Sequence, residues 1–125
     1  MTTTSIDDLI RAKRAFGTAV CQRISECIAK LGFSVQSRID LPSYDAVQFS
    51  LVTDPYTQSE DLVGYWYDGS RQRIGQIQFH GDGSVYAEYD IVQPHPSKKQ
   101  FFVEAINAWG SLDNIKTEAK LLAMP

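Results

Sequence analysis

The chain has 125 residues, a mass of 14.0 kDa and a formal charge of −3 at pH 7. This length suits one domain, and 43% apolar with 22% charged residues is a globular composition, which excludes a disordered or fibrous main state. No apolar run approaches the roughly 18 residues of a membrane span. The net charge does not favour nucleic-acid binding. We therefore expect one domain over residues 1–125, with no membrane partner and with a protein partner favoured over a nucleic acid.

The cysteines and the N-terminus indicate a cytoplasmic protein. Cys21 and Cys27 are six residues apart, which on one helix turns their side chains about 240° from each other, so a mutual disulfide is not expected. The first residues lack the basic start and apolar stretch of a signal peptide. No Cys/His spacing is typical of a zinc site, so we expect reduced thiols, no metal and no cofactor.

Residues 5–31 have the spacing of one amphipathic helix, with apolar side chains every three or four positions. Ser5 is a suitable N-cap, and Gly32 is a suitable left-handed C-cap. Gly17 lies inside this span, where glycine costs about 1 kcal/mol relative to alanine. We interpret Gly17 as a position where the helix packs closely against a sheet.

The apolar period then changes from 3.6 to 2, which indicates strands. Turns rich in proline, glycine and aspartate separate these segments. Five strands are predicted here: residues 33–41, 47–51, 62–67, 71–79 and 85–92.

The clearest turn is residues 80–84, His-Gly-Asp-Gly-Ser, because two glycines flank an aspartate. If Phe79 faces Val85 across this hairpin, every second pair is apolar. The opposite face then carries three polar pairs, namely Gln78 with Tyr86, Gln76 with Glu88, and His80 with Ser84. The hairpin therefore has one apolar face and one polar face, as in an antiparallel sheet with a solvated side.

A second helix is predicted over residues 97–110. Ser97 and Gln100 have capping-box spacing, and Phe102, Ala105, Ile106 and Trp109 would share its buried face. A last strand over residues 115–121 would add to an edge of the sheet or insert beside the first strand. The expected fold is α+β, a single antiparallel sheet of five or six strands with two helices on one face, in the order α-β-β-β-β-β-α-β.

The candidate binding residues are those expected on or beside the open sheet face: Trp66, Tyr86, His80, Glu88 and Asp90. No nucleophile elbow, phosphate loop or dinucleotide fingerprint is present, so we assign no catalytic residue and expect a non-enzymatic protein. The proposed register puts His80 more than about 12 Å from Glu88 along the strands, too far for both to hold one metal ion.

The charge is unevenly distributed. Residues 41–95 contain eight acids and two bases, a net of −6, and the rest of the chain is +3. With exposed aromatic side chains, an acidic face is typical of a surface for a basic protein partner or for head-to-tail self-association.

Two alternatives remain open. One is a small-ligand-binding protein or enzyme with a pocket between the sheet and the first helix, rimmed by His80 and Glu88. The other is a nucleic-acid adaptor that uses Arg11, Arg14 and Lys30 of the first helix.

Overall fold

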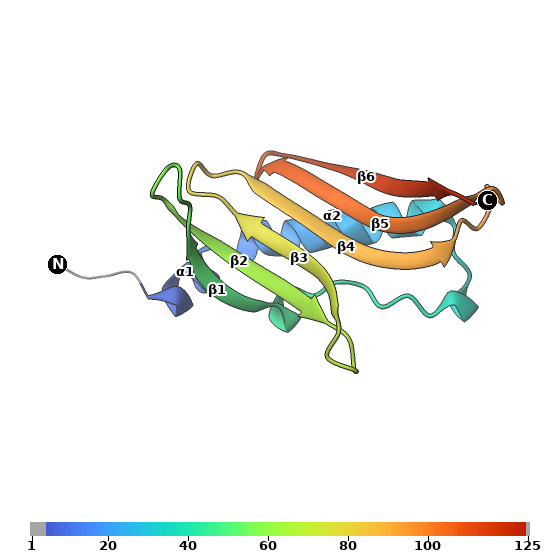
Figure 1. Cartoon of the computed structure of the whole chain (residues 1–125), viewed down its shortest axis with the longest axis horizontal. Coiled ribbons are helices and arrows are strands. Elements are labelled where there is room, and N and C mark those ends of the chain that lie inside the picture. Colours follow the sequence, from blue (N-terminus) through green and yellow to red (C-terminus); the bar gives the residue numbers. More distant parts are fainter. Residues whose placement is uncertain (1–4, 125) are drawn as a thin grey trace.

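In a computed structural model, which describes residues 5–124, two helices precede a six-stranded antiparallel sheet (Figure 1). Residues 1–4, on which part of the signal-peptide argument rests, lie outside the described range. The strands neighbour one another in chain order, so the last strand lies at an edge. The elements are α1 (Ile6–Ala12), α2 (Arg14–Leu31), β1 (Gln48–Thr53), β2 (Glu60–Tyr67), β3 (Arg73–Phe79), β4 (Val85–Pro94), β5 (Phe101–Ser111) and β6 (Asn114–Ala123).

The predicted N-terminal helix is present but is divided in two at Lys13, which has φ −92° and ψ 2°. The Ser5 side chain accepts a hydrogen bond of 3.2 Å from the amide of Asp8, as expected of an N-cap. Gly32 ends α2 with φ 85°, the left-handed conformation that glycine adopts without strain. Neither described helix is long and apolar enough to cross a membrane.

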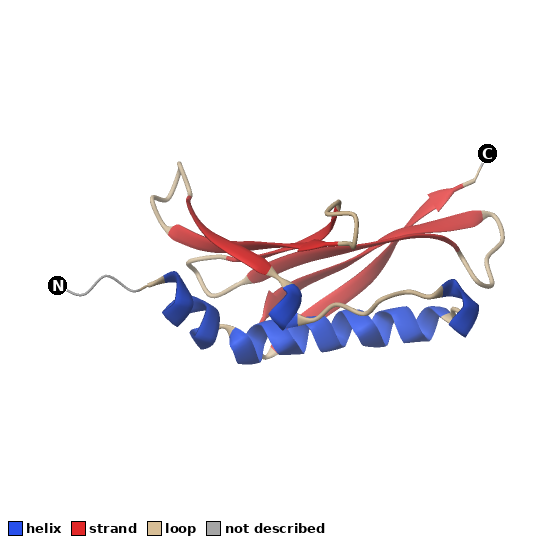
Figure 2. Cartoon of the chain, turned by 90° about the horizontal axis from the view of Figure 1, so that it is seen from below, coloured by secondary structure: helices blue, strands red, loops and turns tan. Residues whose placement is uncertain are grey.

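Both helices lie on one face of the sheet (Figure 2), α1 against β1 and β2, and α2 against β5 and β6. α2 buries one stripe of side chains against the sheet. At Gly17, an added Cβ would lie 3.3 Å from the Phe79 ring and even closer to the Tyr44 ring, so the predicted close contact is confirmed. The fully buried side chains of this core include Val20, Ile24, Ile77, Phe79, Val103 and Ile106.

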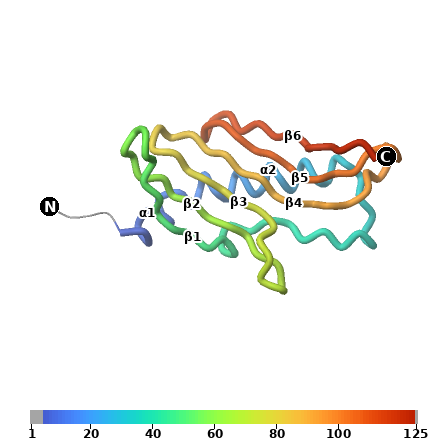
Figure 3. Tube along the Cα trace, viewed as in Figure 1, coloured from blue at the N-terminus to red at the C-terminus, as the bar shows by residue number. Residues whose placement is uncertain are grey.

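The prediction of a strand over residues 33–41 is wrong. This segment contains a short 3₁₀ turn, η1 (Val35–Ser37), and irregular chain (Figure 3). A second turn, η2 (Tyr44–Ala46), follows it and contacts α2. Val35 is 92% exposed, whereas Phe33 and Ile39 pack partly buried against the core, so the apolar alternation here places side chains on the core without forming a strand. Aromatic groups hold the segment instead: the Trp66 indole donates to the carbonyl of Ser43 and the Tyr89 hydroxyl to that of Asp40, both at 2.9 Å.

The prediction of a helix over residues 97–110 is also wrong, because this span forms a turn and β5. A bulge between Val103 and Ala105 shifts the alternation of inward and outward side chains by one residue. Val103 and Ile106 therefore both face the core, three positions apart, which imitates the spacing of a helix.

The predicted register of the hairpin between β3 and β4 is confirmed. Phe79 pairs with Val85, Gln78 with Tyr86, and the alternation continues to Gly75 with Tyr89. At the turn itself, the amide of His80 donates to the carbonyl of Ser84 at 2.9 Å. The α+β class, the antiparallel sheet and the one-sided helical layer are therefore as predicted, although the second helix is α1 and not residues 97–110.

Candidate functional site

Strand β4 places three of the five predicted residues on the open face. Val85, Ala87 and Tyr89 point into the core, and Tyr86, Glu88 and Asp90 alternate with them and are half-buried. Within the described part of the chain the helices cover the other face (Figure 2), so these three side chains lie on the side of the sheet without helices. Their predicted location is confirmed.

Trp66 does not lie on the open face, and the prediction that it does is wrong. Its side chain is 2% exposed, packs edge-on against Tyr89 at 5.4 Å between ring centroids, and is held by the carbonyl of Ser43. Alternation along β2 therefore sends Leu62, Gly64 and Trp66 inward. The sequence alone does not decide whether Trp66 points inward or outward. In either case one face of β2 carries Trp66 and the other carries Tyr65 and Tyr67.

Strand β5 extends the open face with residues of the span 97–110, which the sequence predicted to be a helix with Trp109 on its buried face. Trp109 is paired directly with Tyr86, and Asn107 with Glu88, so each pair shares a face. Glu104 lies at the bulge and forms an ion pair of 3.2 Å with Lys120 of β6. We call Tyr86, Glu88, Asp90, Glu104 and Trp109 together the β4–β5 surface.

The β4–β5 surface has unbalanced electrostatics. Burial, followed by the negative charges of Glu88 and Glu104, raises the pKa of Asp90 above its usual value. Arg73 and Lys120 oppose this rise but act on Asp90 through charge alone. Glu88 accepts a hydrogen bond of 3.2 Å from the Tyr86 hydroxyl. Among the residues that the structure describes, Asp90 thus lacks a hydrogen-bonded cation.

Next to these acids the surface is shallowly hollowed. Arg73, Gly75, Gln76, Glu88 and Asp90 line a hollow of about 100 Å³. The Arg73 guanidinium stacks over the Tyr65 ring at 4.8 Å and keeps its positive charge, so the hollow holds two carboxylates, those of Glu88 and Asp90, and one guanidinium. Sequence reasoning missed Arg73 and Tyr65. If the sequence had identified Tyr65 and Tyr67 as the outward-facing residues of β2, it would have placed Tyr65 on the open face beside Arg73 of the neighbouring strand β3.

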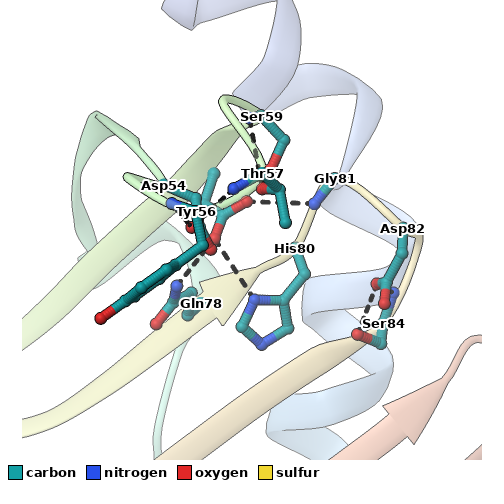
Figure 4. Close-up of polar contacts among 10 residues, drawn as sticks. Asp54, Tyr56, Thr57, Ser59, Gln78, His80, Gly81, Asp82 and Ser84 are labelled. Atoms are coloured by element: carbon teal, nitrogen blue, oxygen red, sulfur yellow. Dashed lines mark hydrogen bonds and ion pairs between the residues drawn. The ribbon is translucent and has the colours of Figure 1, made fainter.

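His80 lies apart from the β4–β5 surface, at the end of the sheet. Its Nδ1 is 3.3 Å from a carboxylate oxygen of Asp61, a residue that the sequence interpretation did not single out (Figure 4). The same carboxylate accepts hydrogen bonds from Gln78 Nε2 at 2.9 Å and from the amide of Gly81 at 3.1 Å. Asp61 is 3% exposed, so these contacts account for a buried charge.

Burial by itself would raise the pKa of Asp61, but hydrogen bonds from Gln78, His80 and Gly81 outweigh it and lower the pKa. Asp61 and His80 line a hollow of about 590 Å³, together with residues of the loop before β2 and of the turn after β3. His80 and Glu88 line two separate hollows, as the register predicted.

Three other polar features are accounted for by contacts within the chain. His95 is buried, and its Nδ1 accepts from the amides of Ser97 and Lys98 at 3.1 and 2.9 Å, so it closes the turn before β5. Arg11 is paired with Asp8, and Arg14 with Asp45. These ion pairs reduce the positive charge available on the helices to a nucleic acid.

The chemistry that the open face can perform is recognition of a cation. No group of three or more His, Cys, Asp or Glu side chains within residues 5–124 is arranged to hold a metal ion. Carboxylates next to aromatic rings suit an arginine or lysine side chain, because the rings contact its apolar stem or planar head while the acids neutralise its charge. Comparisons of the chain with protein families, curated proteins and solved structures find no match.

Proposed function

We propose that this chain is a non-enzymatic binding protein whose β4–β5 surface docks a basic segment of a protein partner. The observation that carries the proposal is Asp90. Its carboxylate is half-buried, and neighbouring acids raise its pKa, yet no described residue donates a hydrogen bond to it. A guanidinium or ammonium group from a partner would supply the missing charge and hydrogen bonds.

The surroundings of Asp90 support a protein partner over a free small cation. Tyr86 and Trp109 stand side by side across β4 and β5, and such aromatic residues are enriched at the centres of protein interfaces. The hollow beside Asp90 is about 100 Å³, which admits one side chain but no larger organic ligand. The proposal includes a cytoplasmic location, which the two free cysteines support.

The proposal is tested by titration of the protein with a hexa-arginine peptide at low salt, followed by calorimetry. We expect Asp90→Asn to weaken binding by about tenfold, because one desolvated charge pair is lost. Glu60→Gln is the matched control, since Glu60 is an exposed acid whose parity in β2 points it to the helical side. Asp90→Asn should not lower the melting temperature, because the folded state already disfavours the ionised form of Asp90.

Two results would contradict the proposal. One is an absence of binding by the unmodified protein at low salt. The other is an equal reduction of affinity by Asp90→Asn and Glu60→Gln, which would indicate attraction to the net charge of the molecule and not to the β4–β5 surface.

A further inference from the structure

The outer edge of β6 (Asn114–Ala123) is unpaired. β6 is the last strand of the sheet, so its outward amide and carbonyl groups meet no neighbouring strand among residues 5–124 (Figure 1). β6 is ten residues long and contains no proline, and the bulge in its ladder with β5 lies on β5. The opposite edge, β1, has only six residues. A long and regular edge is a template for another strand.

The charges on β6 indicate which strand fits. Lys116 and Glu118 are both exposed on the open-face side of β6, and neither forms an ion pair with any residue that the structure describes. In an antiparallel pairing of β6 with a second β6 centred on Thr117, Lys116 of each copy lies opposite Glu118 of the other. Ile115 then lies opposite Ala119, which adds apolar contact on the helical side.

A groove along the β6 edge is lined by both acidic and basic side chains. It has a volume of about 710 Å³ and lies between α2 and the hairpin that joins β5 to β6. Arg23 and Glu26 line its α2 side, and Asp113, Lys116 and Glu118 line its hairpin side. A uniformly acidic or basic segment would meet repulsion in this groove, whereas a segment of alternating charge, such as β6 of a second copy, would meet less.

We propose that the β6 edge binds a second copy of this chain, forming a two-fold symmetric dimer with one continuous sheet of twelve strands. The pairing is centred on Thr117 and brings together two Lys116–Glu118 pairs. The pairing uses the edge of the sheet, although Trp109 of the β4–β5 surface also lines the adjoining groove. It rests on Lys116 and Glu118 and does not require Asp90, so it can be tested independently of the proposed function.

Charge exchange at the two positions tests the dimer. In sedimentation velocity from micromolar to near-millimolar concentrations, the unmodified protein should dimerise. Lys116→Glu places glutamates opposite each other twice and should weaken dimerisation by about tenfold. Glu118→Lys should do the same. The double variant Lys116→Glu, Glu118→Lys restores opposite charges in both pairs and should recover the original affinity. Lys99→Glu, the same charge change in the turn before β5, should have no effect.

The single variants change exposed side chains, and far-UV circular dichroism will verify that each remains folded. A protein that stays monomeric throughout the concentration range overturns the proposal. So does a dimer that Lys116→Glu leaves intact, because its interface then lies elsewhere. Failure of the double variant to recover dimerisation overturns the register centred on Thr117, and with it the proposed interface.

Discussion

Two aspartates on the open side of the sheet have opposite pKa shifts. Asp61 is buried but accepts three hydrogen bonds, and its pKa is lowered. Asp90 accepts no such hydrogen bonds, and its partial burial, followed by the charges of Glu88 and Glu104, raises its pKa. The ionised carboxylate of Asp61 therefore stabilises the folded state at neutral pH, whereas the folded state disfavours the ionised form of Asp90. This contrast is why Asp90 and not Asp61 is the proposed binding group.

We predict that Asp61→Asn destabilises the protein by about 1–3 kcal/mol at pH 7, because charge-assisted hydrogen bonds to a buried acceptor are lost. The pKa of folded Asp61 lies below its unfolded value of about 3.9, so its stabilisation is present above that pH and disappears as the pH falls through the folded value. Urea unfolding of the unmodified protein should thus show a steeper loss of stability below about pH 4 than that of the variant.

Glu60→Gln, which neutralises the neighbouring exposed acid, provides the comparison for this experiment and should change neither quantity. Parallel loss of stability by the unmodified protein and Asp61→Asn between neutral and strongly acidic pH would contradict the role assigned to Asp61.

The sequence was sufficient to locate Tyr86, Glu88 and Asp90, because the glycine-flanked turn at residues 80–84 sets the register of β3 and β4. It was not sufficient for Trp66 or Asp61. The inward direction of Trp66 depends on a hydrogen bond to Ser43, 23 residues away, and Asp61 meets His80 only once β2 has paired with β3. Both depend on long-range pairing, which local periodicity does not encode.

Among the elements, β5 shows how a bulge conceals a strand. Without the bulge between Val103 and Ala105, inward residues would alternate throughout and the period of 2 would be visible. With it, Val103, Ile106 and Ala108 face the core at spacings of three and two. Sequence periodicity therefore predicted a helix, and as a result Trp109 was assigned to a buried face and not to the open one.

The sequence predicted close packing of α2 at Gly17 against the sheet, and the structure adds a tighter contact there with Tyr44 of η2. We predict that Gly17→Ala destabilises the protein by about 1–3 kcal/mol, since the new methyl group overlaps the buried Tyr44 ring. This direction is opposite to the helix propensity of alanine, which favours the substitution by about 1 kcal/mol.

Thermal unfolding of Gly17→Ala measures this effect, with Gly69→Ala as its counterpart. Gly69 lies in a turn, and a Cβ there meets no atom within 4 Å, so that variant should be neutral or slightly stabilising. A Gly17→Ala protein as stable as the unmodified one would show that Tyr44 can move aside and that the close approach of α2 is not required.

At the scale of the whole molecule, the sheet runs in chain order with both helices on one side, and no element among residues 5–124 covers its other face or its two edges (Figure 2). The net charge of −3 over 125 residues is the sum of unevenly distributed charged side chains. Acids gather on the β4–β5 surface, whereas alternating charges occupy the edge at β6. The two proposed interactions therefore use different parts of the sheet and predict different partners.

The most direct test of the central proposal uses the two tryptophans as reporters in one nuclear magnetic resonance titration. Trp109 lies on the open face beside Tyr86, and Trp66 is buried on the helical side with its indole bonded to Ser43. On addition of the hexa-arginine peptide, the indole resonance of Trp109 should shift in a saturable manner while that of Trp66 stays in place. A shift of Trp66 alone, of both equally, or of neither would contradict binding at the β4–β5 surface.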